Sequence, residues 1–141
     1  MKPRPLRFLT ELLSQPTAPF REEHVLALVE RALLRARVPA FLDPAGNLVV
    51  GADSPAAYRS LLRERSKDPV RLFIAHMDHP GFHGTRWLTP KRLAVKWHGG
   101  SPVKHLAGSP VWLADASGYL ADGVLARVRL LPSGQAIDTA E

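Results

Sequence analysis

The spacing of apolar residues divides the chain into a helical first part and a β-rich second part. Apolar side chains recur at helical intervals in two early segments and predict helices over residues 5–15 and 20–37. The prolines within residues 16–19 separate the two segments. The second segment carries Glu in its first turn and Arg near its end, an arrangement that suits the helix dipole.

A hairpin and a third helix are predicted next. Residues 40–42 and 48–51 have the pattern of short strands, and Asp, Pro, Gly and Asn gather between them at 43–47, as in a tight turn. A Ser-Pro pair precedes residues 56–65, which are predicted to form a helix with a serine cap and proline in its first turn.

Residues 70–75 (VRLFIA) form a short run rich in β-forming residues and apolar on both faces. Such a run is typical of a buried strand. The resulting order of helix, helix, strand, strand, helix and strand is the opening of an α/β domain.

The helical periodicity ends after Gly81. Short strands are predicted at 84–88, 92–97, 110–113 and 124–131, separated by Gly, Pro and Ser. This pattern favours a small β-barrel or sandwich. We place the boundary near Pro80, so that residues 1–80 form part of an α/β domain and residues 81–141 a β-rich domain.

Composition narrows the classes of function. Hydrophobic residues make up 45% of the 141 and charged residues 23%, a balance typical of globular proteins. The absence of cysteine excludes disulfides, thiolate metal sites and cysteine nucleophiles. The net charge of +6 is spread along the chain rather than concentrated in one segment, which argues against nucleic-acid binding. No apolar run is long enough to span a membrane, so we expect a cytoplasmic protein.

His76 and Asp78 follow the predicted strand directly. On a strand, residues two apart point to the same side, so His76 could ligate a metal ion while Asp78 orients the imidazole. The alternative is structural: His76 ends the strand and Asp78 begins a turn. His79 and His83 add two more imidazoles nearby. No Glu lies between Asp78 and the last residue, which argues against a self-contained zinc site.

Other candidates favour structural roles. The Asp43 turn has the residues of an ordinary tight turn. His98 precedes two glycines that predict a loop or bulge without a helix to cradle phosphate. Trp87, Trp97 and Trp112 are expected to be core or interface anchors.

Taken in order, these segments resemble the N-terminal part of the M42 family of metallo-aminopeptidases, the group of glutamyl aminopeptidases, endoglucanase-like proteins and TET peptidases. The resemblance rests on Asp43-x-x-Gly46-Asn47-Leu48, Ile74-Ala75-His76-Met77-Asp78, Gly81-Phe82, Trp97-His98-Gly99-Gly100, Leu106-Ala107-Gly108-x-x-Val111 and Gly123-Val124. It implies a partial aminopeptidase-like α/β domain followed by a small β-barrel-like inserted domain.

The resemblance also implies a chemistry. The family removes N-terminal residues from peptides with two zinc ions or other divalent metals. His76 matches the first metal ligand, and Asp78 matches the adjacent catalytic carboxylate that orients this ligand. The family motif continues with Glu and Ile, where this chain has His79 and Pro80. The remaining ligands and the general base come from a region after the inserted domain that has no counterpart before Glu141.

Three hypotheses follow from the sequence. The chain is the N-terminal portion of such a peptidase and inactive alone, with a peptide as substrate once it is completed. Alternatively, it is a non-catalytic binding or oligomerisation module derived from the same scaffold. The third hypothesis is a basic protein associated with nucleic acid. The first two imply self-association or a partner chain, because an incomplete sheet leaves an unpaired edge.

Overall fold

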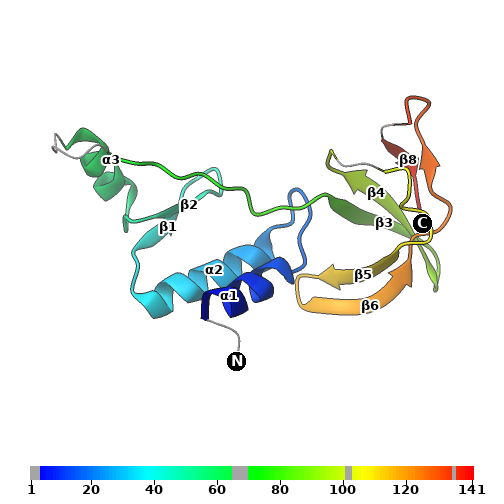
Figure 1. The fold of residues 1–141 in the computed structure, drawn as a ribbon, viewed down its shortest axis with the longest axis horizontal. Coiled ribbons are helices and arrows are strands. Elements are labelled where there is room, and N and C mark those ends of the chain that lie inside the picture. Colours follow the sequence, from blue (N-terminus) through cyan, green and yellow to red (C-terminus); the bar gives the residue numbers. More distant parts are fainter. Residues whose placement is uncertain (1–3, 65–69, 101–102, 135) are drawn as a thin grey trace. The chain divides into compact units, whose positions relative to one another are not determined.

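The computed structural model describes residues 4–64, 70–100, 103–134 and 136–141, and within them helices and small antiparallel sheets make a mixed α/β structure (Figure 1). The chain divides into two compact units. Unit 1 comprises residues 1–12 and 25–76, and unit 2 comprises residues 13–24 and 77–141. The mixed α/β class is confirmed. Each described sheet has two strands, so no closed barrel forms among these residues.

The two predicted N-terminal helices are present as α1 (Arg4–Leu13) and α2 (Glu23–Ala36). The second helix begins later than predicted because Phe20 adopts a left-handed backbone (φ 70°) and Arg21 pairs with Ala18 in a short bridge. Helix α2 buries Val25 and Leu28. None of the helices that the structure describes is long and apolar enough to cross a membrane.

The hairpin of unit 1 pairs β1 (Ala40–Leu42) with β2 (Leu48–Val50), as predicted. Asp43 closes the turn by accepting hydrogen bonds from the backbone nitrogens of Ala45 (2.9 Å) and Asn47 (2.8 Å) and from the Asn47 side chain (2.9 Å). These bonds lower the pKa of the Asp43 carboxyl, with the side-chain bond from Asn47 as the largest cause. The predicted tight turn is therefore confirmed.

Helix α3 (Pro55–Arg63) begins as its cap predicts. The Ser54 hydroxyl accepts a hydrogen bond from the backbone nitrogen of Ala57 at 3.2 Å, and Pro55 occupies the first turn, where its missing N–H costs no intrahelical bond.

The predicted buried strand at 70–75 is wrong. Residues 70–79 form neither helix nor strand, and the side chains of Phe73 and Ile74 are 90% and 87% exposed. A strand needs a neighbour that takes up its backbone N–H and C=O groups. None of the described strands pairs with this segment, so its apolar pattern alone does not make it a strand.

The strands that the structure describes in unit 2 form three consecutive hairpins. The strands are β3 (Gly81–Thr89), β4 (Arg92–His98), β5 (Pro110–Asp115), β6 (Gly118–Val124), β7 (Arg129–Leu130) and β8 (Ile137–Thr139). They pair in sequence order, β3 with β4, β5 with β6 and β7 with β8 (Figure 1).

The prediction of one strand over 124–131 needs correction. Strand β6 begins at Gly118 and ends at Val124, and the chain resumes strand structure only at Arg129. Arg127 interrupts it with a left-handed backbone (φ 49°), which lies outside the β region of a regular strand.

The core of unit 2 joins distant parts of its chain. Val103, Leu125, Ile137 and Ala140 are buried together, and apolar residues of β3, β4 and β5 pack around them. The last residue also takes part, because the backbones of Glu141 and Ala126 exchange two hydrogen bonds. The end of the chain is thereby fixed to the core.

Candidate functional site

His76 and Asp78 lie where the chain passes from one unit to the other. His76 is the last residue of unit 1 and is exposed, whereas Asp78 belongs to unit 2 and is half-buried. No strand carries the pair, so the same-side argument for a strand does not apply to them. Their metal-binding and orienting roles stay predictions.

A segment from the N-terminal part of the chain covers one face of the β3–β4 hairpin. We call residues 17–21 the strap. The Thr17 hydroxyl donates a hydrogen bond to the carbonyl oxygen of Met77 at 3.1 Å. A β-carbon added to Gly81 would lie 2.9 Å from that of Ala18, so only glycine permits this approach of the two backbones.

Two histidines meet beneath the strap. The rings of His83 (β3) and His98 (β4) have centroids 4.1 Å apart and planes inclined by 31°. The Nε2 atom of His83 lies 2.9 Å from the carbonyl oxygen of Pro19 and donates to it, because a carbonyl can only accept. The Phe20 ring stands edge-on to His98, with centroids 6.2 Å apart. We call His83 and His98 the histidine pair.

The electrostatics of the histidine pair favour a neutral His98. Partial burial, the neighbouring His83 and Lys96 all lower the pKa of His98 below the usual value of 6.5, with burial as the largest cause. His83 and Lys96 lie on the same hairpin as His98. Neutral imidazoles can stack and can accept a proton on an unprotonated ring nitrogen. The Nε2 of His83 is not such an acceptor, because its hydrogen is donated to the carbonyl oxygen of Pro19.

The structure corrects the expected grouping of histidines. The sequence placed His83 beside His76 and His79, but its ring instead contacts His98, which was expected to lie in a loop. The signal for this contact is the register: Lys96 faces His83 and His98 faces Gly81, so the two histidines are diagonal neighbours on one face.

The other face of the same hairpin is structural. Phe82 and Trp97 face each other across the strands with ring centroids 4.8 Å apart and pack against the core of unit 2. The Trp97 indole nitrogen donates to the carbonyl oxygen of Gly99 at 2.9 Å. Trp97 is thus a core anchor as expected, whereas Trp87 and Trp112 are 59% and 47% exposed.

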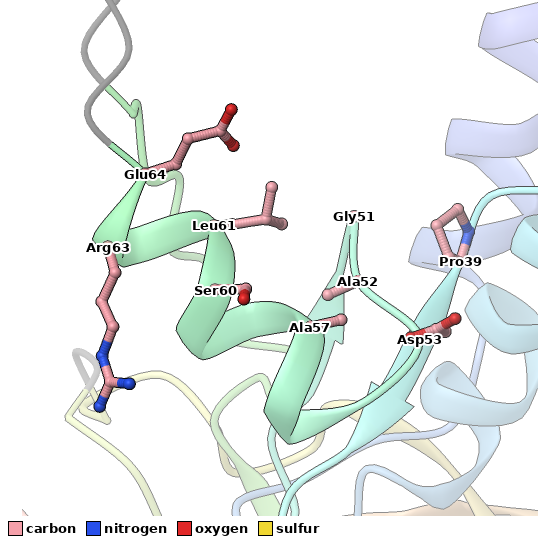
Figure 2. Close-up of a pocket in the computed structure, with 9 residues that line it drawn as sticks. All are labelled: Pro39, Gly51, Ala52, Asp53, Ala57, Ser60, Leu61, Arg63 and Glu64. Atoms are coloured by element: carbon pink, nitrogen blue, oxygen red, sulfur yellow. The ribbon is translucent and has the colours of Figure 1, made fainter.

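An open depression in unit 1 lies between α3 and the segment 51–53 (Figure 2). Its walls are mostly small or apolar, with Ala52, Ala57 and Leu61 among them. The polar residues on its border, Asp53 and Ser60 for example, do not form a histidine or carboxylate cluster. Its carboxylates, Asp53 and Glu64, are not part of any group of three or more metal-ligating side chains among the described residues.

The donor set does not complete a metal centre. No group of three or more His, Asp or Glu side chains able to share a metal ion occurs in the part of the chain that the structure describes. A two-metal peptidase site needs several ligands and a base. His76 and Asp78 supply at most one corner of such a site.

Comparison with known proteins adds no relative. No protein-family model, no curated protein and no solved structure matches this chain.

Proposed function

We propose that this chain is the N-terminal portion of an M42-like metallo-aminopeptidase, a cytoplasmic hydrolase that removes N-terminal residues from peptides. In this proposal unit 1 belongs to a partial aminopeptidase-like α/β domain, and unit 2 corresponds to the β-barrel-like inserted domain. His76 contributes one ligand to a site for zinc or another divalent metal, and Asp78 orients that ligand.

One observation carries the proposal. The chain leaves unit 1 at His76 and enters unit 2 at Met77, and everything after this point belongs to the β-rich unit. The family resemblance expects an inserted β domain directly after the His-x-Asp motif. His76 is therefore both the candidate metal ligand and the last residue of unit 1.

The proposal also implies that the 141 residues do not hydrolyse peptides alone. His76 and Asp78 do not hold two metal ions by themselves, since no group of three or more described His, Asp or Glu side chains could hold even one ion. The remaining ligands and the base must come from residues outside this sequence, which we expect to be a continuation or a partner chain.

A chimera tests this proposal. The chain is joined to the segment of an M42 aminopeptidase that follows its own inserted domain, and bound zinc and hydrolysis of an aminoacyl p-nitroanilide are measured. We expect both in the chimera and neither in the chimera with His76→Ala. The matched control, His79→Ala, changes a neighbouring exposed histidine and should retain both. A folded chimera without zinc or hydrolysis would contradict the proposal.

A second candidate is a non-catalytic oligomerisation module built on the same scaffold. The observation that favours it is the segment 70–75. Its apolar side chains are of the kind that is usually buried, but they are exposed to solvent. Zinc-independent self-association of the 141-residue chain would support this function.

A further inference from the structure

We propose that residues 70–75 form an intermolecular β-strand, by which two copies of this chain pair antiparallel about a two-fold axis at Phe73. We call residues 70–75 the pairing segment. Self-association through this segment does not depend on the peptidase proposal.

The pairing segment exposes two kinds of group that a second strand would cover. Its large apolar side chains are exposed: Val70 by 56%, Leu72 by 63%, Phe73 by 90% and Ile74 by 87%. Its backbone N–H and C=O groups form no hydrogen bond with any other described residue. A second strand would satisfy the backbone groups and cover part of the apolar surface in one step.

Two-fold symmetry restricts the register. A two-fold axis that relates two antiparallel strands runs perpendicular to the sheet, so each side chain lies on the same face as its copy in the partner. Directly opposed residues also share a face, so the axis must pass between one residue and its own copy. With the axis at Phe73, the two phenyl rings face each other and Leu72 faces the partner's Ile74. Aromatic and branched aliphatic pairs of this kind stabilise antiparallel strands.

Charge disfavours the neighbouring register that has its axis at Leu72. Arg71 is the only charged residue of the pairing segment. With the axis at Phe73, the two Arg71 positions are four residues apart along the ladder, about 13 Å, and this exceeds the screening length of about 8 Å in physiological salt. With the axis at Leu72 they would be about 7 Å apart and would repel each other.

The segment's complementarity to itself argues for a second copy as the occupant. Every apolar residue from Leu72 to Ile74 faces an apolar residue of the same segment, and Arg71 faces Ala75. Long-range charge opposes the pairing, because unit 1 carries eleven Arg and Lys residues against six Asp and Glu. We therefore expect a weak dimer that added salt strengthens, whereas an acidic partner would be released by salt.

Sedimentation equilibrium of the 141-residue chain measures the association from micromolar to submillimolar concentration. We expect a monomer–dimer equilibrium for the native sequence, at least tenfold weaker dimerisation for Phe73→Asp, and no change for Leu34→Asp. Leu34 is a matched control because it is 79% exposed on α2. Circular dichroism verifies that each variant is folded. A monomer at all concentrations, or equal loss in both variants, would overturn the proposal.

Disulfide trapping tests the register, and the chain has no native cysteine to interfere. Arg71→Cys protein and Ala75→Cys protein are oxidised separately and as an equal mixture. We expect cross-linked dimers mainly in the mixture, since residue 71 faces residue 75 of the partner while each residue lies about 13 Å from its own copy. Efficient cross-linking of Arg71→Cys alone, or none in the mixture, would overturn the antiparallel pairing at Phe73.

Discussion

The histidine pair shows how a side chain on one strand sets the proton affinity of another. His83 and His98 come from different strands, and their rings are close enough for a proton on one to oppose a proton on the other. Lys96 adds to this opposition, and partial burial contributes most. His98 should therefore remain neutral at pH values where an exposed histidine is already protonated.

Replacing His83 tests this coupling. We expect His83→Gln to raise the pKa of His98 toward 6.5 without reaching it, because burial and Lys96 continue to lower it. The pKa is read from the His98 ring-proton shifts in an NMR titration. His105→Gln, a change at an exposed histidine, should leave it unchanged. An unchanged or lower pKa in His83→Gln would show that the rings do not interact as described.

The same shift gives unit 2 a dependence on pH. Because the pKa of His98 is lower in the folded chain than its usual value of 6.5, the unfolded chain binds the proton first as the pH falls. The contribution of His98 to stability is thus fully present above pH 6.5 and is lost as the pH falls through the folded pKa. His98→Gln should remove this part of the pH dependence of the urea midpoint.

Among the elements, the approach of β4 to the start of β3 depends on a glycine. Gly99 has a φ of +125°, and a β-carbon there would lie 2.7 Å from the β-carbon of Pro80 and 2.8 Å from its α-carbon. Neither neighbour is the flexible end of a long side chain. The end of β4 and the beginning of β3 can therefore meet only with glycine at this position.

Gly118→Ala provides a matched comparison for Gly99→Ala. Gly118 has nearly the same φ, +124°, but no atom lies within 4 Å of an added β-carbon. Both changes strain the backbone, and Gly99→Ala adds the clash with Pro80, so we expect it to lower the free energy of unfolding by about 1–3 kcal/mol more. Urea denaturation measures the difference. Equal losses would mean that the Pro80 contact is relieved without cost.

The elements also show what the sequence can and cannot predict. The helices and the β1–β2 hairpin follow from local signals, such as the Ser54 cap and the Asp43 turn, and the structure confirms them. The strand at 70–75 was wrong because pairing is a property of two segments, and apolar composition describes only one of them. The histidine pair was missed because it depends on the cross-strand register between His83 and His98, which neither local sequence encodes.

At the scale of the whole molecule, the pairing segment is the exposed stretch of unit 1 that precedes the start of unit 2. Its backbone is neither helix nor strand and forms no hydrogen bond to other described residues, which leaves it accessible to a protease. Elements on either side are held by helices or by strand ladders. The chain should therefore be cut here before either unit unfolds.

Chymotrypsin at low protein concentration tests this expectation. We expect the first cleavages after Leu72 and Phe73, identified by intact mass. Phe20 is the internal control: it is also exposed, at 80%, but the strap holds it through the bridge between Ala18 and Arg21. Earlier cleavage at Phe20 would show that the strap opens more readily than the pairing segment.

The strap has a consequence for the order in which unit 2 can form during synthesis. Within the strap, Thr17 bonds to a residue 60 positions later and Pro19 to one 64 positions later. Just after the strap, the His24 ring contacts, through Nε2, the carbonyl oxygen of Asp115, 91 positions later. Contacts so distant in sequence form late, because the loop between them must first be closed. The ribosome therefore releases the strap long before its partners exist. Unit 2 can be completed only when nearly the whole chain has emerged, so a protein product shortened near its carboxyl end would leave an early segment uncovered.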